Sequence, residues 1–380
     1  MSVFRNLTVI ELGRVFSGPF CGMILGDTGL RVIKIEKPGT GDESRQFGEQ
    51  ISDNQSCYFN SLNRNKESVV LDLKNDDDKK VLLNLLKTAD VLVHNWIQGS
   101  LDKLGFSYEH IKVLNPKLIY CSISGFGLRS PYKNDPAQDI IAQSLSGLQS
   151  LTGDENGDPL KTGIPIVDYS SGLYASYAIM SALYMREKTN KGQFVDTSLL
   201  ETALAMTSFA SSVYMSKGIM KKRMGNSHPL ICPYNVYKTT DGFVSIAVAN
   251  NNMWNNFCKA LNLKIANDIK FITNNNRIDN RKKLDKIISK AIRRYSTDGV
   301  CKVLKANKVS CSQVFDLKQA LNSEEVKSLK MEIECGPDGA YKFIGSPFHM
   351  SENINTDFTS PPVLGEHTDK IKNQILKNLS

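Results

Sequence analysis

SVVLDLKNDDDKKVLLNLLKTADVLVHN, residues 68–95, contains two strand-like runs separated by a helical one. The runs 68–73 and 91–95 are rich in valine and leucine, which predicts strands. Between them, 75–87 opens with aspartates and continues with lysines and leucines, as expected for a helix whose charges complement its dipole. A strand, a helix and a second strand in this order predict a βαβ unit with parallel strands.

Further strand-like runs at 7–12, 31–36 and 118–122 extend this pattern. We therefore predict an α/β fold, with a Rossmann-like parallel sheet in a large domain and a smaller α/β domain. Right-handed crossovers bring the loops after parallel strands to one edge of the sheet, where ligands of open α/β sheets bind. No GxGxxG motif and no P-loop lysine follow the first strand. The sequence therefore does not favour a binding site for a nicotinamide dinucleotide or for ATP.

The chain has 380 residues, more than one hydrophobic core usually supports, which predicts two domains. A composition change at 221–229, KKRMGNSHP, marks the expected boundary. We predict a large domain over 1–220, completed by 330–380, and a small domain over 221–329. Within the small domain, Asp241-Gly242 predicts a turn between two strands.

Bulk composition is that of an ordinary globular protein, with 41% hydrophobic and 23% charged residues. The N-terminal residues lack the features of a secretory signal, and the longest apolar stretches are too short and too polar to span a bilayer. These observations predict a cytoplasmic protein without a membrane partner. The eight cysteines are scattered without metal-ligand spacing, so neither a metal site nor a disulfide framework is expected.

The formal net charge is +8, but Lys and Arg are spread along the chain and alternate with acidic residues and Asn. This distribution does not favour nucleic acid as a partner. Only a general affinity for anions follows, which a small polyanionic cofactor such as coenzyme A, with its phosphates, would satisfy as well as DNA would.

Asp168 stands where the apolar run 163–167 meets a stretch that predicts a long, mostly buried helix. An aspartate at such a junction is commonly a helix N-cap. The same position suits a nucleophile, because a strand-to-helix turn exposes the side chain beside free backbone N–H groups. The spacing alone does not separate these two roles.

Other candidates follow the ends of predicted strands. The turn at Gly125 either permits close backbone approach to a ligand or is only a tight turn. Lys37, Lys74 and Lys103 are typical surface charges, but their placement after successive strands is where phosphates would gather.

Short sequence blocks spread over nearly the whole chain point to a known family. They are LTVIELG (7–13), GP (18–19), VIKIEKPGTGD (32–42), NRNKESVVLDLK (63–74), NPKLIYCSISGFG (115–127), GIPIVD (163–168) and LGEHTD (364–369). In this order they resemble the class III CoA-transferase family, the CaiB/BaiF group that includes formyl-CoA:oxalate and carnitine CoA-transferases.

This resemblance implies an enzyme that moves coenzyme A from an acyl-CoA donor to a carboxylic acid without a metal. Asp168 matches the family's catalytic aspartate, which attacks the donor thioester to give a mixed anhydride and then carries CoA as an aspartyl thioester. The resemblance also implies contacts with CoA. Lysines would bind its phosphates, and aromatic rings would pack on the adenine or the pantetheine arm. With Gly125 and Asp139 added, the predicted contacts are Val15, Phe16, Lys37, Leu71, Lys74, Asn95, Trp96, Lys103, Gly125 and Asp139.

The chain also departs from its apparent relatives. Many of them carry Asn-Phe-Arg-Pro-Gly where this chain has NWIQG (95–99), and Lys103 matches an arginine in some, so phosphate contacts are expected to be redistributed. The Gly-rich loop of the formyl-CoA enzyme has no equivalent, because RMGNSH (223–228) occupies that region, which makes oxalate doubtful as the acceptor. Relatives form interlocked dimers, and we expect a homodimer with the site between large and small domains.

Two alternatives remain at this stage. The α-methylacyl-CoA racemases resemble the same blocks but pair the aspartate with a histidine in Gly-His-Asp, since racemisation needs two bases. This chain has AQD at 137–139, and glutamine cannot exchange a proton. A CoA-binding or nucleic-acid-binding module without catalysis is disfavoured by the retained Asp168. The sequence does not name the donor or the acceptor acid.

Overall fold

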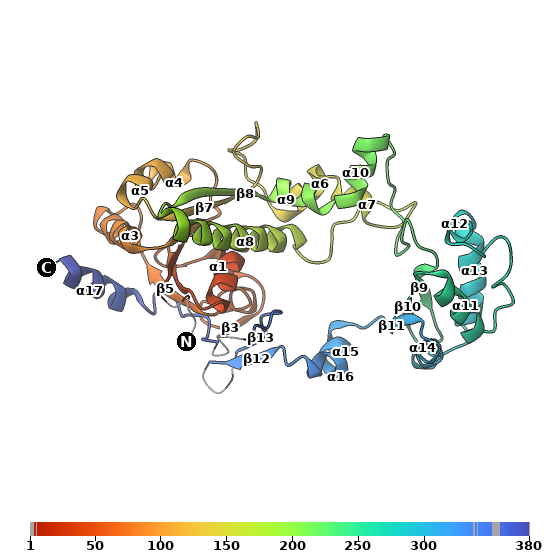
Figure 1. Ribbon diagram of the computed structural model, residues 1–380. Coiled ribbons are helices and arrows are strands. Elements are labelled where there is room, and N and C mark those ends of the chain that lie inside the picture. The colour runs from red at the N-terminus through yellow and green to blue at the C-terminus, as the bar shows by residue number, and fades with distance from the viewer. Residues whose placement is uncertain (1–3, 5, 337–338, 340, 352–357, 380) are drawn as a thin grey trace. The chain divides into compact units, whose positions relative to one another are not determined.

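The computed structural model describes residues 4, 6–336, 339, 341–351 and 358–379 (Figure 1). The chain forms two compact units. Unit 1 comprises Met1–Gln149, Lys161–Ile219 and Leu329–Ser380, and unit 2 comprises Ser150–Leu160 and Met220–Ser328. Unit 2 thus includes a short segment that lies inside the large domain expected from the sequence, and the exact domain limits stay a prediction.

Unit 1 is built on a six-stranded sheet in which every neighbouring pair is parallel. The spatial order is β5 (Lys66–Val70), β2 (Arg31–Glu36), β1 (Thr8–Glu11), β6 (Val91–His94), β7 (Ile119–Ser124) and β8 (Gln193–Ser198). The chain builds outward from β1 through β2 to β5, then returns to add β6 beside β1. This order is that of a doubly wound sheet, with its switch point between β1 and β6. The predicted Rossmann-like parallel sheet is confirmed.

Alternate strand residues face opposite sides of the sheet, and each side carries helices. On one side, Val9 and Val91 pack with α1 (Ser17–Asp27) and α8 (Ile166–Thr189). On the other side, Ile10 and Leu92 pack with α3 (Asp76–Thr88), α5 (Tyr108–Leu114) and α17 (Thr368–Leu379). The predicted helix over 75–87 is α3, and the Asn75 side chain caps it by accepting from the N–H groups of Asp77 and Asp78.

Shorter elements complete the region around this sheet. They are η1 (Glu43–Gln46), β3 (Gln50–Ser52), β4 (Gln55–Ser56), α2 (Cys57–Asn60), α4 (Ser100–Lys103), α6 (Asp139–Leu145), α7 (Leu148–Leu151), α9 (Leu199–Met206), α10 (Ser208–Lys217), β12 (Glu332–Cys335) and β13 (Tyr341–Ile344).

Unit 2 contains an antiparallel three-stranded sheet ordered β11 (Ser310–Gln313), β10 (Phe243–Ala247), β9 (Tyr234–Lys238). The predicted turn at Asp241-Gly242 joins β9 to β10. The helices are α11 (Asn251–Ala260), α12 (Asn274–Asp279), α13 (Arg281–Ile292), α14 (Thr297–Ala306), α15 (Leu317–Asn322) and α16 (Glu324–Ser328). The core of this unit includes the fully buried Trp254.

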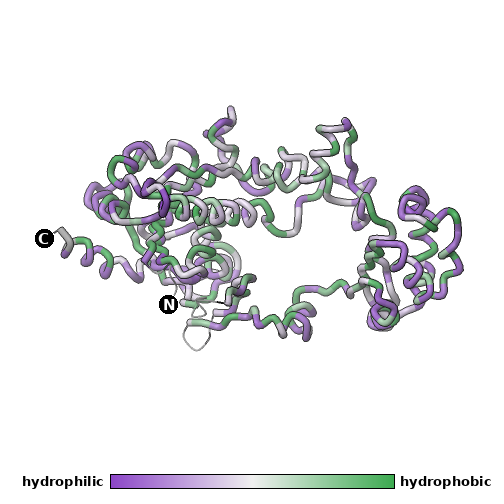
Figure 2. The backbone as a smooth tube through the Cα atoms, viewed as in Figure 1, coloured by the Kyte–Doolittle hydropathy of each residue, from purple (hydrophilic) through white to green (hydrophobic). Residues whose placement is uncertain are grey.

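Two expectations about the helix near Asp168 are wrong. No strand precedes it, and α8 begins at Ile166 with Pro165 in the cap position, so Asp168 lies inside the first turn and is not the N-cap. The helix is also not mostly buried, because only the face against α1 and the sheet is covered and Tyr177 is 72% exposed. Figure 2 shows few strongly hydrophilic residues along most of α8, which explains why the sequence reads as buried. In the described parts of the chain, no helix is long and apolar enough to cross a bilayer.

Candidate active site

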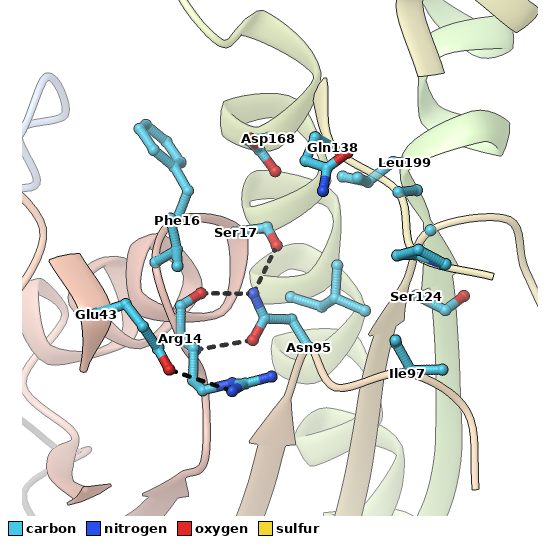
Figure 3. Close-up of a pocket in the computed structure, with 15 residues that line it drawn as sticks. Arg14, Phe16, Ser17, Glu43, Asn95, Ile97, Ser124, Gln138, Asp168 and Leu199 are labelled. Carbon is cyan, nitrogen blue, oxygen red and sulfur yellow. Dashed lines mark hydrogen bonds and ion pairs between the residues drawn. The ribbon is translucent and has the colours of Figure 1, made fainter. Parts of the chain in front are cut away.

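A cavity of about 330 Å³ lies in unit 1 beyond the carboxyl ends of the strands (Figure 3). Ligands of doubly wound sheets bind at this edge, near the switch point, and the volume is within the range of small-molecule sites. The residues that line it follow β1, β2, β6, β7 and β8 or begin α8: Arg14, Val15, Phe16, Ser17, Glu43, Asn95, Ile97, Ile123, Ser124, Gly125, Pro136, Ala137, Gln138, Asp168 and Leu199.

One wall of the cavity is the loop between β1 and α1, whose two ends touch each other. A Cβ atom on Gly13 would lie 2.9 Å from the Gly18 Cα, and one on Gly18 would lie 2.8 Å from the Gly13 Cα. Neither position has room for a side chain. The residues between them are therefore pushed out toward the cavity, and Val15 takes a φ of +62°, which is unusual for a β-branched residue.

Asn95, which follows β6, ties this loop to the other side of the switch point. Its Oδ1 accepts from the Arg14 N–H at 2.8 Å, and its Nδ2 donates to the Arg14 carbonyl at 2.8 Å and to the Ser17 Oγ at 3.2 Å (Figure 3). The Asn95 amide thus satisfies both backbone groups of one loop residue. The sequence analysis predicted Asn95 as a ligand contact, and the structure gives it a structural role in the cavity wall.

Asp168 enters the cavity from the first turn of α8 (Figure 3). Beside it, Asp139 at the start of α6 fills the role of the missing cap. The Asp139 Oδ1 accepts from the N–H groups of Val167 at 2.8 Å and Asp168 at 3.4 Å. Its Oδ2 accepts from the Gln143 amide at 2.5 Å. Asp139 is 9% exposed, so its carboxylate holds the start of α8 from a buried position behind Asp168.

Burial and, as the smaller cause, the neighbouring Asp139 carboxylate together raise the pKa of Asp168 to about 7. A carboxylate with this pKa is a stronger base and nucleophile than an ordinary aspartate. The Asp168 charge also affects Tyr58. Burial, as the larger cause, and the Asp168 carboxylate, as the next, raise the pKa of the Tyr58 hydroxyl to about 12. Such a perturbed carboxyl group in a cavity marks a candidate catalytic residue.

Gly125 lies on the opposite wall, at the end of β7. A Cβ atom there would lie 2.4 Å from the Ala137 Cβ, so only glycine lets these two segments approach. The Gly125 carbonyl accepts from the N–H of Leu200, and the Ser124 hydroxyl accepts from the N–H of Gly127. The close approach seen here is to Ala137 of the same chain, and approach to a ligand stays a prediction.

Five of the predicted site residues line the cavity together: Val15, Phe16, Asn95, Gly125 and Asp168. The others are not among the residues that line it. Lys37 is exposed and pairs with Glu43 at 2.7 Å, and the Trp96 ring lies under the Arg14 guanidinium at 5.2 Å. The Leu71 side chain belongs to the buried core, so only its backbone is available to a ligand. Lys74 and Lys103 are exposed.

Several lining residues were missed by the sequence analysis, notably Arg14, Ser17, Glu43, Ser124 and Leu199. A usable signal existed, because each of them ends a strand or follows one within a few residues. What the sequence could not give was the strand order that brings these ends together. Among the described residues, no group of His, Cys, Asp and Glu is arranged to hold a metal ion.

Comparison with known proteins identifies the family of the chain. The model of CoA-transferase family III matches residues 4–368. The chain belongs to this family. Human succinyl-CoA:glutarate CoA-transferase is 35% identical to it over 98% of this chain and 86% of its own length. Acetyl-CoA:oxalate CoA-transferase of Acetobacter aceti is 36% identical over 88% of this chain and 86% of its own length.

The fold comparison agrees with this assignment. A crystal structure of a CAIB/BAIF family protein from Brucella suis matches with a TM-score of 0.89 and 32% identity, covering 98% of this chain and 99% of the other. The resemblance noted from the sequence blocks is confirmed. This family III CoA-transferase is an enzyme that uses acyl-CoA and carboxylic acids as substrates.

Proposed function

We propose that Asp168 is the nucleophile that carries coenzyme A between the donor and the acceptor acid. The observation that carries the proposal is the position of a desolvated carboxylate, with its pKa raised to about 7, inside the cavity at the switch point of the sheet. About half of the molecules then carry an ionised Asp168 at neutral pH. The matching position in the family resemblance supports the same residue.

The reaction follows from carboxylate chemistry in four steps. The Asp168 carboxylate attacks the donor thioester, the C–S bond breaks, and CoA leaves as a thiolate from a mixed anhydride. The thiolate attacks the Asp168 carbonyl carbon, which releases the donor carboxylate and forms an aspartyl-CoA thioester. The acceptor carboxylate attacks this thioester and expels CoA again. CoA then attacks the acceptor carbonyl of the second anhydride, which restores the Asp168 carboxylate with no net proton change.

The geometry suits these steps because the intermediates must be kept from water. Asp168 is partly buried, and Phe16 and Leu199 contribute apolar surface to the same cavity. The exposed cations Lys37, Lys74 and Lys103 come after β2, β5 and β6 in the chain and are proposed to bind the phosphates of CoA. Backbone groups near Val15 and Leu71 are proposed to complete the CoA site.

We propose dicarboxylic acids as the substrate class. Relatives named for succinyl-CoA and glutarate support this class. The relative named for oxalate, at comparable identity, keeps oxalate among the acids to test, although the sequence at 223–228 made it doubtful.

We also propose that the enzyme is a cytoplasmic homodimer. The uncovered face of α8 carries Leu173, Tyr174, Tyr177 and Tyr184, each more than half exposed in the isolated chain. A second copy would bury this surface, as expected for an obligate interface. Sedimentation equilibrium should give twice the chain mass, and a monomer across the concentration range would contradict this part of the proposal.

A transfer assay tests the catalytic role. Succinyl-CoA is mixed with glutarate or with oxalate, and the new acyl-CoA is measured by liquid chromatography and mass spectrometry. Asp168→Asn should lower the rate by about a thousandfold or more, whereas Asp298→Asn, which alters an exposed carboxylate of unit 2, should not. Full activity of Asp168→Asn would contradict the proposal.

The racemase alternative predicts a different readout. Gln138 lines the cavity near Asp168, where a racemase of this superfamily would place its second base. A 2-methylacyl-CoA incubated in deuterium oxide should therefore gain no α-deuterium. Enzyme-dependent exchange in the absence of any acceptor acid would favour the racemase.

A further inference from the structure

The loop between β1 and α1 is held in a conformation that its own residues disfavour. Val15, near the middle of this loop, has a φ of +62°. In this region the Cβ of an L-residue crowds the backbone carbonyl, and a β-branched side chain makes the crowding worse. Strain of this kind persists only where the surrounding structure imposes it, and it is concentrated at functional sites.

Asp42 binds the backbone of Val15 in this conformation. Both oxygens of its carboxylate accept from the Val15 N–H, at 3.1 and 3.2 Å. The same carboxylate accepts from the N–H and the hydroxyl of Ser44, at 2.9 and 2.8 Å, which fixes its orientation. Asp42 is only 3% exposed, so solvent offers it no alternative partner.

Behind Asp42 lies a buried network of charges. The fully buried Lys34 ammonium contacts the Asp42 Oδ2 at 2.9 Å, the Glu11 Oε1 at 2.9 Å and the Gly13 carbonyl at 2.8 Å. Lys66, also fully buried, contacts the other Glu11 oxygen at 2.8 Å. Lys34 therefore touches the loop directly through Gly13 and indirectly through Asp42.

Stability alone is a weak reason for such a network. Taking several charges out of water is expensive, and well-packed apolar residues of similar volume are often at least as stabilising. What apolar residues could not do is accept a hydrogen bond from the Val15 N–H and donate one to the Gly13 carbonyl. These two bonds hold the loop from this side, in addition to the bonds that Asn95 makes to Arg14 and Ser17.

We propose that Asp42, supported by Lys34, is a positioning residue that holds the strained loop so that the CoA site is formed before CoA arrives. Residues 14–17 of this loop all line the cavity. Without Asp42, Val15 would relax to negative φ, which would reorient its peptide groups and displace the neighbouring Phe16. The proposal rests on the proposed function, because it assumes that this cavity binds CoA.

A matched pair of variants tests the proposal by isothermal titration of coenzyme A. Asp42→Asn keeps the shape of the side chain but removes its charge. Asp27→Asn does the same at another 3%-exposed aspartate, which is paired with Arg64 at 2.5 Å and does not line this cavity. Asp42→Asn should weaken CoA binding by about tenfold or more, and Asp27→Asn by less than about twofold. Equal losses in the two variants would overturn the proposal.

A rescue experiment separates positioning from general destabilisation. Glycine adopts positive φ without the steric penalty, so Val15→Gly combined with Asp42→Asn should regain most of the lost CoA affinity. A double variant that binds no better than Asp42→Asn would contradict the strain argument.

Two further results keep the test decisive. If Asp42→Asn does not fold, hydrogen exchange at the Val15 amide of the unmodified enzyme decides instead, since the bond to Asp42 predicts slow exchange and an unprotected amide would overturn the proposal. If the unmodified enzyme does not bind CoA, the proposed function fails, while the exchange measurement still decides whether Asp42 holds the loop.

Discussion

Replacing Asp168 by asparagine should make the enzyme more stable while it abolishes transfer. The pKa of this carboxyl is raised from 3.8 to about 7, so the folded protein resists its ionisation over about three pH units. Each pH unit corresponds to about 1.36 kcal/mol, which gives at most ~4 kcal/mol of destabilisation when Asp168 is ionised. Because the side chain is only partly buried, solvent screening reduces this cost, and we expect about 2 kcal/mol.

The pH dependence identifies the cause of that gain. Below about pH 4 the carboxyl is protonated in both the folded and unfolded chain, so it costs nothing. As the pH rises toward 7, the unfolded chain ionises first and the folded enzyme loses stability; above 7 the full cost is present. The asparagine variant has no carboxyl group to ionise at this position. Its free energy of unfolding, relative to that of the unmodified enzyme, should therefore grow between about pH 4 and 7 and then level off.

Urea unfolding near pH 5 and near pH 8 measures the difference. Asp298→Asn serves as the control, because its carboxylate is exposed and pairs with the neighbouring Lys302 in the same helix. An advantage for Asp168→Asn that is equal at the two pH values, or a lower stability at pH 8, would refute the reasoning about desolvation.

Other consequences can be measured with single variants. Burial is the main cause of the raised pKa of Asp168 and the Asp139 charge the smaller one, so Asp139→Asn should move the acidic limb of the pH–rate profile modestly to lower pH; an unmoved limb would show that the two carboxyl groups are not coupled. Gly22→Ala places a Cβ 1.9 Å from the buried Glu11 carboxylate and should cost about 1–3 kcal/mol in urea unfolding, whereas Gly163→Ala, with open space around it, should cost under about 0.5 kcal/mol. Asn95→Ala removes its three bonds to Arg14 and Ser17 after β1 and should raise the KM for acyl-CoA by about tenfold; an unchanged KM would show that the loop holds without it.

Much of the fold could be predicted from local patterns. The strands at 31–36 and 91–95 and the helix at 75–87 are short elements whose composition agrees with their structure, so their limits were right within two residues. The helix containing Asp168 was harder, because apolar residues lie all around it while only one face is covered within the chain. Sequence periodicity cannot distinguish a face that packs in its own chain from one that is left for a partner.

Part of the cavity lining could be predicted from the sequence. Val15, Phe16, Asn95, Gly125 and Asp168 were predicted because their positions match a family pattern or follow a strand, and the structure places all five in the cavity wall. The hydrogen bond between Asp42 and Val15 could not be predicted from the sequence. It depends on a buried charge network assembled from three strands, and on a loop conformation that valine does not favour. Tertiary hydrogen bonds of this kind leave no mark in composition or spacing.

The most direct test of the account is chemical capture of the acylated enzyme. The enzyme is mixed with succinyl-CoA, quenched with hydroxylamine and digested, and the peptide containing residue 168 is examined by mass spectrometry. Hydroxylamine displaces CoA from an aspartyl thioester and leaves a hydroxamate on that side chain, so we expect this modification at Asp168 and its loss in Asp168→Asn. An unmodified Asp168 in an enzyme that is turning over under the same conditions would contradict the account.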